Sequence, residues 1–348
     1  MKDPKISVWM ITYNHESFVA QAIESVLMQE TDYPVELVIG EDGSTDGTRA
    51  ICAEYARIHP ERVRLLLGER NLGMMANMVR TLAACRGPYV ALCEGDDYWT
   101  DPRKLQKQTE WLDRHPEASF CFHPCRIETA GSAAGETGAP GGHRFTGARK
   151  QETFADGRAL VMWCIVPTVS AVVRRSMLPD FGDEWQTAPV GDWPLFFHLA
   201  MRGPFGCLGE TMAAYRLHGG SAWSSKSVTA QKNTVLEAYR FIRKLGVEVY
   251  PNEFRKADVN QLRDYVDDIC LGDGSGNKIQ SVLAEGIGRI ASPFYSRRQL
   301  SRLALQALYY KTRQAGRQDD SRRVLPLLIK RHPFLLLDRH WMRYWLKG

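Results

Sequence analysis

The chain has 348 residues, of which 44% are hydrophobic and 24% charged, and its formal net charge is +5. This composition is typical of a soluble globular protein with a core of normal size, and the length suggests one large domain with an extension. The sequence shows no signal peptide and no apolar run that would cross a membrane, and its eight cysteines form no paired framework. We therefore expect a cytoplasmic protein with reduced thiols.

The positive charge is concentrated at the C-terminal end. From residue 289 onward there are 14 Lys and Arg against 3 Asp and Glu, a net charge of +11. The preceding residues hold 31 basic and 37 acidic side chains, a net charge of −6. Such asymmetry favours contact with an anionic partner, and a solvated helical face is the alternative interpretation.

The first hundred residues alternate between two patterns. Short apolar runs, typical of buried strands, occur at 5–11, 35–40, 63–67 and 89–93, and apolar residues at helical spacing occur at 17–29, 48–59 and 74–85. Such alternation predicts an α/β fold with a parallel sheet and helices on both faces. Ligands of such sheets bind beyond the carboxyl ends of the strands, where the polar clusters of this sequence fall.

The remaining segments are less periodic. We expect helices at 102–114 and 193–201, strands at 118–125 and 166–174, and a mostly helical chain beyond residue 224. Residues 130–147 are rich in Gly and Ala and predict a long loop, of the kind that serves as a lid on a rigid scaffold.

The strongest chemical signal is an acidic segment directly after the strand at 89–93. Glu94, Asp96 and Asp97 place three carboxylates within four residues. Carboxylates held this close repel one another, and a hard divalent cation such as Mg²⁺ or Mn²⁺ removes that repulsion. An acidic turn at a strand end is the alternative.

Two further polar clusters follow the first two strands. Asp42 lies in a Glu-Asp-Gly-Ser-Thr-Asp segment, where a carboxylate can accept a hydrogen bond from a base N–H or a ribose hydroxyl. Asp46, in the same segment, is better explained as a cap of the next helix. Tyr13, between Thr12 and Asn14, offers an aromatic ring that can stack on a nucleobase.

Taken in order, these segments resemble the family 2 glycosyltransferases and their GT-A nucleotide-binding fold. The match rests on residues 6–14, on 41–48, on Asn-Leu-Gly at 71–73 and on Glu-Gly-Asp-Asp-Tyr-Trp at 94–99. It covers roughly residues 5–225. We therefore expect a GT-A catalytic domain at 1–225, with a mostly parallel central sheet flanked by helices, and a helical basic C-terminal region at 226–348.

The resemblance implies a nucleotide site, a metal site and a catalytic base. Asp96 would bind the Mn²⁺ or Mg²⁺ cofactor together with His218, and Glu94 replaces the aspartate that usually begins the Asp-x-Asp motif of the family. Asp192 would be the general base, with capping of the helix that follows as the alternative role. The nucleotide site would comprise Thr12, Tyr13, Asn14, Asp42, Asn71, Glu94, Gly95, Asp96 and Arg216. The acceptor would meet Asp97, Trp99, Thr168, Ser170 and Trp193.

The activity implied by this resemblance is inverting transfer of one sugar from a nucleotide-sugar, a UDP-sugar by family habit, to an acceptor hydroxyl. A lipid-linked glycan of bacterial surface polysaccharide synthesis is the acceptor that we expect. The chain lacks the Gln-x-x-Arg-Trp motif of the processive relatives. The C-terminal region, where basic residues alternate with aromatic ones, suits the anionic inner face of the cell membrane, and a subdomain that forms a homodimer is the alternative.

Two other classes of function stay open. A sugar-phosphate nucleotidyltransferase would carry a Gly-rich loop with Arg and Lys after the first strand, where this chain has Thr-Tyr-Asn-His-Glu. A non-catalytic scaffold with a transferase fold would be favoured by the loss of Asp96 or Asp192, and both are present. We expect no nucleic-acid partner, because the sequence shows no nucleic-acid-binding module.

Overall fold

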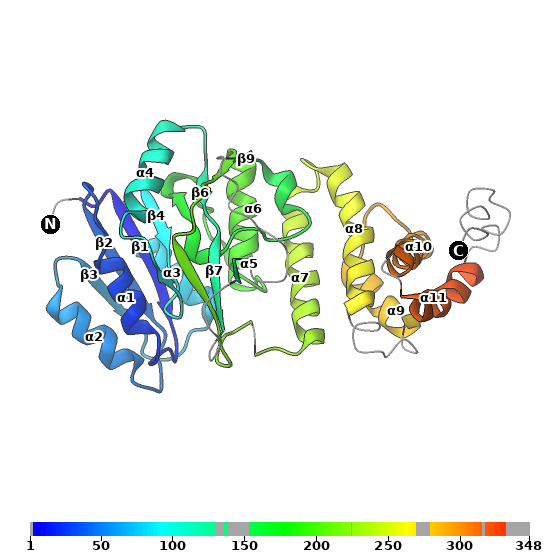
Figure 1. Cartoon of the computed structure of the whole chain (residues 1–348), viewed down its shortest axis with the longest axis horizontal. Helices are drawn as coiled ribbons and strands as arrows, with labels where there is room; N and C mark the ends of the chain where they lie inside the picture. The colour runs from blue at the N-terminus through cyan, green and yellow to red at the C-terminus, as the bar shows by residue number, and fades with distance from the viewer. Residues whose placement is uncertain are drawn as a thin grey trace. The chain divides into compact units, whose positions relative to one another are not determined.

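The structure, a computed structural model, describes residues 3–129, 136–137, 153–223, 225–268, 279–314 and 317–331. Its internal contacts divide the chain into two compact units, Met1–Ser225 and Lys226–Gly348, which are described separately below (Figure 1). Most of the loop expected at 130–147, and the part of the basic tail beyond residue 331, lie outside the described residues.

The first unit is built on a twisted mixed sheet. Within the described residues the sheet has eight strands, in the order β3 (Val63–Leu67), β2 (Val35–Glu41), β1 (Ile6–Thr12), β4 (Tyr89–Leu92), β10 (Val172–Arg174), β6 (Phe120–Phe122), β11 (Phe205–Cys207) and β9 (Thr153–Ala155). The first four strands are parallel, as are β6 and β11, while β10 is antiparallel to both of its neighbours. The expected α/β class with a mostly parallel sheet is confirmed.

Helices cover both faces of this sheet (Figure 1). They are α1 (Val19–Leu27), α2 (Thr48–Ile58), α3 (Met74–Ala84), α4 (Lys104–Arg114), the short α5 (Asp183–Gln186) and α6 (Asp192–Arg202). Successive residues of a strand point to opposite faces. Val8 and Met10 of β1 share a core with α1, whereas Trp9 donates its indole N–H to the Met78 carbonyl of α3 at 3.2 Å. All seven residues of β1 are therefore buried.

A second, smaller sheet joins segments that are distant in the sequence. Its order is β5 (Tyr98–Trp99), β12 (Ala213–Leu217), β7 (Cys125–Thr129) and β8 (Glu136–Thr137), and β12 runs parallel to β7 and antiparallel to β5. This pairing brings the segment after Ala213 beside the acidic segment that precedes β5.

Two expected strands differ from the structure. The strand predicted at 118–125 is divided into β6 and β7 at Pro124, whose nitrogen has no hydrogen to donate to a sheet. In the strand predicted at 166–174, only Val172–Arg174 is extended, because Thr168–Ser170 forms a 3-10 turn closed by hydrogen bonds from Ser170 to the Pro167 carbonyl. Further 3-10 turns lie at Gly157–Leu160 and Arg175–Met177.

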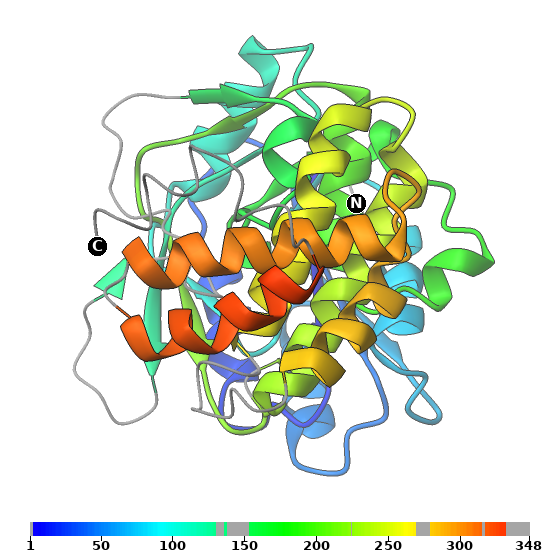
Figure 2. The ribbon, with the colours of Figure 1, turned by 90° about the vertical axis from the view of Figure 1, so that its right-hand side faces the viewer.

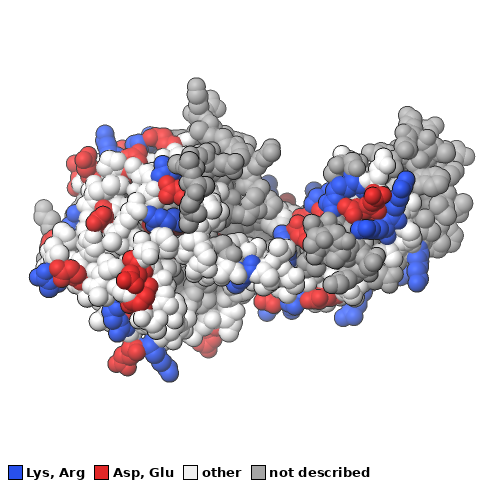
Figure 3. Space-filling view, turned by 60° about the horizontal axis from the view of Figure 1, so that its bottom comes forward, with Lys and Arg blue, Asp and Glu red and all other residues white. Residues whose placement is uncertain are grey.

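The second unit is helical in its described residues, as expected. It comprises α7 (Val228–Gly246), α8 (Pro251–Val266), α9 (Ile279–Ile290), α10 (Arg297–Gln314) and α11 (Gln318–Arg331), which Figure 2 shows from a second side. Leucine, isoleucine, valine and tyrosine side chains from all five helices form its core. Within the described ranges, none of these helices combines the length and apolar character needed to cross a membrane. On the face shown in Figure 3, Lys and Arg surround a small group of acidic side chains.

Candidate active site

The loops that follow β1, β2 and β4 are held together at one edge of the sheet. The backbone N–H of Asp42 donates to the carbonyl of Thr12 at 3.1 Å, and that of Gly95 donates to the carbonyl of Ile11 at 2.9 Å. The three polar clusters of the sequence therefore meet at the carboxyl ends of the parallel strands, as expected of this sheet type.

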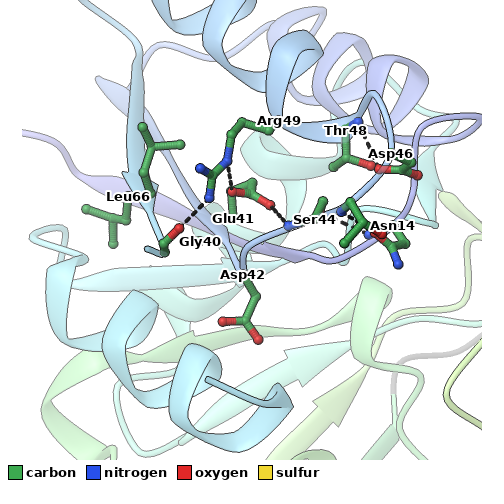
Figure 4. Close-up of polar contacts among 12 residues, drawn as sticks. Asn14, Gly40, Glu41, Asp42, Ser44, Asp46, Thr48, Arg49 and Leu66 are labelled. Carbon is green, nitrogen blue, oxygen red and sulfur yellow. Dashed lines mark hydrogen bonds and ion pairs between the residues drawn. The ribbon is translucent and has the colours of Figure 1, made fainter. Parts of the chain in front are cut away.

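The loop after β2 is built around an ion pair whose carboxylate is buried (Figure 4). Glu41 is fully buried, accepts a hydrogen bond from Arg49 Nε at 2.8 Å and accepts another from the backbone N–H of Ser44 at 2.5 Å. Asn14, which has a positive φ of 55°, accepts from the backbone N–H of Thr45 at 2.9 Å. Asn14 therefore joins the first loop to the second.

Asp46 is bound to the start of α2 by its carboxylate, and the N-cap residue of that helix is Gly47. Asp46 Oδ1 accepts from the backbone N–H of Thr48, at the start of α2, at 3.0 Å, and Asp46 Oδ2 accepts from that of Glu16 at 3.1 Å. A carboxylate at this position satisfies N–H groups that the first turn of a helix leaves without a partner.

Asp42 points away from the Glu41–Arg49 pair (Figure 4). Its two oxygens accept from the backbone N–H groups of Leu72 at 2.9 Å and Gly73 at 3.0 Å, and Asn71 Oδ1 also accepts from Gly73 at 2.8 Å. Gly73 has φ 90°, a conformation that side chains other than glycine adopt rarely. Asp42 and Asn71 thus fix the loop that enters α3. Tyr13 is 40% exposed, so its ring is accessible to a ligand.

Gly95 allows the acidic segment to approach β1. A Cβ atom at this position would lie 2.6 Å from Thr12 Oγ1 and 2.7 Å from Thr12 Cβ, which is closer than real contacts allow. Thr12 is itself 2% exposed and cannot move aside into solvent. Only glycine at position 95 therefore keeps Asp96 at this distance from the first loop.

Asp96 lies between two histidines. Its Oδ2 is 3.2 Å from His218 Nε2 and 3.6 Å from His15 Nε2. Burial alone would raise the pKa of Asp96, but the hydrogen bond from His218 and the charges of the two imidazoles lower it below its ordinary value. Burial lowers the pKa of His15. Sequence reasoning missed His15, although it directly follows Asn14 in the first loop.

These donors fit a divalent cation that is completed by substrate oxygens. Among the described residues, no group of three His, Cys, Asp or Glu side chains is arranged around one metal position. Ligands on adjacent corners of an octahedron with bonds of about 2.1 Å lie about 3 Å apart. The 3.2 Å between Asp96 and His218 matches that spacing, and phosphate oxygens are the partners that such an ion prefers.

Two further carboxyl groups, Glu94 and Asp192, lie near Asp96. Burial, together with the charges of Asp96 and Asp192, raises the pKa of Glu94 to about 8. Asp192 begins α6, and its Oδ1 accepts the backbone N–H of Trp193 at 2.7 Å. Burial still raises the pKa of Asp192 above its ordinary value. Asp192 therefore lies inside the first turn of α6, accepts the N–H of the next residue and lies among the acidic groups.

Arg216 braces the acidic segment from β12. Its Nη1 donates to the Asp96 carbonyl at 2.9 Å, and its backbone N–H donates to Asp97 Oδ1 at 2.9 Å. The guanidinium carbon lies 4.3 Å from the centroid of the Tyr98 ring and 5.4 Å from that of Phe18. Contacts within the protein therefore hold the Arg216 side chain.

Tyr215 is a second residue that sequence reasoning missed. Burial raises the pKa of its hydroxyl, and the charges of Asp97, Glu94, Asp96 and Asp192 raise it further. The preceding residue in the strand pairs with Tyr98, and the following residue is Arg216, so its position depends on the pairing of β12.

The residues expected to meet the acceptor require a correction. Trp99, Ser170, Trp193 and Asp97 are at most 4% exposed, so they have almost no surface to offer an acceptor. The two indole N–H groups donate to the carbonyls of Val169 and Leu160, and the Ser170 hydroxyl donates to that of Pro167. Asp97 Oδ1 accepts the backbone N–H of Arg216, so we expect these four residues to support the site and not to meet the acceptor. Thr168 is half-buried.

The fold of the first unit is that of the GT-A glycosyltransferases, and comparison with known proteins agrees. Residues 7–172 match the family model described as glycosyl transferase family 2. The crystal structure of S. aureus TarS in complex with UDP-GlcNAc superposes with a TM-score of 0.52 at 15% identity, covering 90% of this chain and 92% of that one. The GT-A fold with a helical C-terminal part is thereby confirmed.

Two curated relatives are similar to this chain. An uncharacterized protein of Mycobacterium tuberculosis is 39% identical over 227 residues, which are 65% of this chain and 63% of the relative. This chain thus spans less than two thirds of that protein. The putative teichuronic acid biosynthesis glycosyltransferase TuaG of Bacillus subtilis is 28% identical over 246 residues, 70% of this chain and 90% of the relative.

Proposed function

We propose that this chain is an inverting, metal-dependent family 2 glycosyltransferase that moves one sugar from a UDP-sugar to an acceptor hydroxyl. The observation that carries the proposal is the cluster of Glu94, Asp96, His218 and Asp192 beside an exposed Tyr13 at the carboxyl edge of the sheet. The UDP-GlcNAc bound by TarS, which shares the fold, supports the choice of donor.

In this proposal the donor lies over the first three loops. The Tyr13 ring stacks on the base, and Asp42 and Asn71 shape the loop against which the base rests. Thr12 and Asn14 hold the first loop, and Gly95 lets the acidic segment pack closely against Thr12.

Asp96 and His218 would hold Mn²⁺ or Mg²⁺ together with diphosphate oxygens. When bound, such an ion neutralises charge on the departing nucleoside diphosphate. Arg216 would support this metal site indirectly, because its guanidinium donates to the Asp96 carbonyl and holds the acidic segment in place. Glu94, whose raised pKa keeps a proton on it near neutral pH, would donate a hydrogen bond to a ribose hydroxyl.

Asp192 is the general base of this proposal. A carboxylate with a raised pKa is a better proton acceptor than an ordinary aspartate. It would take the proton of the acceptor hydroxyl, whose oxygen attacks the anomeric carbon opposite the departing diphosphate. Such an in-line attack inverts the configuration and needs no covalent enzyme intermediate.

The acceptor that we propose is a glycan on a lipid carrier, used for a bacterial surface polysaccharide at the cytoplasmic face of the membrane. The support is the role that the name of the TuaG relative describes, in teichuronic acid biosynthesis. The basic second unit would then touch the anionic membrane that holds this acceptor.

The test measures nucleoside diphosphate release from a panel of nucleotide-sugars, with and without Mn²⁺ or Mg²⁺. Turnover of a UDP-sugar that needs the ion and is lost in Asp96→Ala would support the proposal. Asp192→Asn should bind the donor normally and lose transfer by about 10² to 10⁴, while Glu69→Gln, at an exposed position, should behave as wild type. Release of pyrophosphate from a nucleoside triphosphate would favour the nucleotidyltransferase alternative, and absence of any donor binding would favour the scaffold.

A further inference from the structure

Four helix ends meet at one end of the second unit. Arg243, near the end of α7, donates to the Ala291 carbonyl just after α9 at 3.1 Å and to Asp258 Oδ1 of α8 at 2.6 Å. Arg255, near the start of α8, lies 5.3 Å from the centroid of the Phe294 ring, just before α10. The connections 247–250 and 291–296, and the helical turns beside them, therefore form one surface, which we call the helix-end surface.

Exposed basic side chains gather on the helix-end surface. They are Lys244, Arg255, Lys256, Arg297 and Arg298, against two acidic side chains, Glu248 and Glu253. Among the residues that the structure describes, none of these five cations forms an ion pair with a carboxylate. The surface thus carries an uncompensated charge of about +3.

The same surface also exposes apolar groups. Val249, in the connection between α7 and α8, is 59% exposed. Phe294 and Tyr295, in the connection between α9 and α10, are half-buried, so part of each ring is accessible. Basic residues beside an exposed aliphatic residue and partly exposed aromatic rings suit the boundary between lipid headgroups and acyl chains.

The far ends of α8 and α10 show the opposite charge arrangement. There Lys311 pairs with Asp267 at 2.7 Å and with Asp264 at 3.3 Å, and Arg317 pairs with Asp267 at 3.0 Å and with Asp320 at 2.7 Å. Lys311 and Arg317 are thus neutralised within the unit. A uniformly solvated basic surface would not separate paired from unpaired cations in this way.

We propose that the helix-end surface docks on an anionic phospholipid bilayer. The inference deepens the function proposed above, since it rests on a membrane-held acceptor, and it names the side chains that make the contact. Arg297 and Arg298 supply electrostatic attraction to the headgroups, and Val249 adds an apolar contact that salt does not screen.

The experiment is flotation of the full chain with vesicles of phosphatidylglycerol and phosphatidylcholine, and with vesicles of phosphatidylcholine alone. Arg297→Gln/Arg298→Gln should weaken binding to the anionic vesicles by roughly 30-fold, from the contribution of each basic residue near a charged membrane. The matched control is Arg322→Gln/Arg323→Gln, which removes the same charge from exposed arginines of α11 that already have acidic partners. Val249→Asp should weaken the binding that persists at high salt.

Equal losses in the two double variants would overturn the proposal, because net charge alone would then explain the binding. Equal binding to phosphatidylcholine alone, or displacement from anionic vesicles by single-stranded RNA at low concentration, would overturn it as well. Donor hydrolysis is measured in the same samples. Normal hydrolysis in a variant that no longer floats separates failure of membrane docking from failure of the proposed transferase activity.

Discussion

Glu94→Gln should stabilise the metal-free protein and reduce the dependence of its stability on pH. In the wild type, burial and the charges of Asp96 and Asp192 raise the pKa of Glu94 from 4.5 to about 8. The folded state therefore binds this proton more tightly than the unfolded chain. The free energy of unfolding should fall as pH rises from about 4.5 to about 8, and glutamine removes that contribution.

The size of the effect follows from the same pKa difference. The gap between 4.5 and about 8 corresponds to an upper limit of ~5 kcal/mol. Glu94 is only partly buried by its accessible surface, so solvent screening reduces this contribution, and we expect about 2 kcal/mol at pH values above the raised pKa. Such a difference is well above the error of denaturant unfolding.

The assay is denaturant unfolding in the presence of a chelator, at a series of pH values across this range. Glu54→Gln is the matched control, since Glu54 is exposed in an ion pair with Arg57 and its pKa is lowered. In the Glu54→Gln control, the free energy of unfolding should still fall above about pH 4.5, as it does in the wild type. If Glu94→Gln shows the same decline as the wild type, Glu94 does not bear the unfavourable charge and the reasoning is refuted.

Two other substitutions test the architecture of the site. Gly95→Ala should lower the free energy of unfolding by about 1–3 kcal/mol, because the new Cβ would lie 2.6 Å from Thr12 Oγ1. Chemical unfolding measures this change, and an unchanged free energy of unfolding would mean that the loop shifts freely. Glu41→Gln should lower the free energy of unfolding by about 1–3 kcal/mol, since it weakens the hydrogen bonds to Arg49 and Ser44. Thermal unfolding that matches the wild type would show that the Glu41–Arg49 pair does not hold the loop.

The sequence predicted the first half of the sheet well, for a physical reason. From β1 to β4 each observed element begins and ends within two residues of its predicted bounds. β1, β2 and β4 are buried on both faces, the edge strand β3 is partly buried, and the helices between them bury one side. Burial therefore leaves a regular apolar pattern in the residues. The clusters at the strand ends followed from this topology.

The second sheet left no comparable pattern. β5 has two residues, and the longer β12 takes its register from Tyr98 and from β7, far away in the sequence. Pairing between such short, distant segments produces no local periodicity. The places of Tyr215 and His218 therefore could not be derived from the residues alone.

The assignment of aromatic residues to the acceptor failed for a related reason. Trp99 and Trp193 each come shortly after an acidic residue, in segments that resemble functional motifs of the family. A buried tryptophan needs a partner for its N–H, and here each indole finds a backbone carbonyl inside the protein. Residue type and position in a motif do not show whether a tryptophan is buried in support of the site or exposed to bind the acceptor.

The carboxylates of the site differ in how the protein compensates their charge. Asp96 has two imidazoles, and Asp97 and Asp192 each accept a backbone N–H. For Glu94, the described residues supply only the unfavourable charges of Asp96 and Asp192. Its ionised form must therefore be stabilised from outside the chain, by a cation or a donor hydroxyl. Saturating Mn²⁺ should accordingly stabilise the wild type more than Glu94→Gln, and equal stabilisation would show that the ion does not relieve this charge.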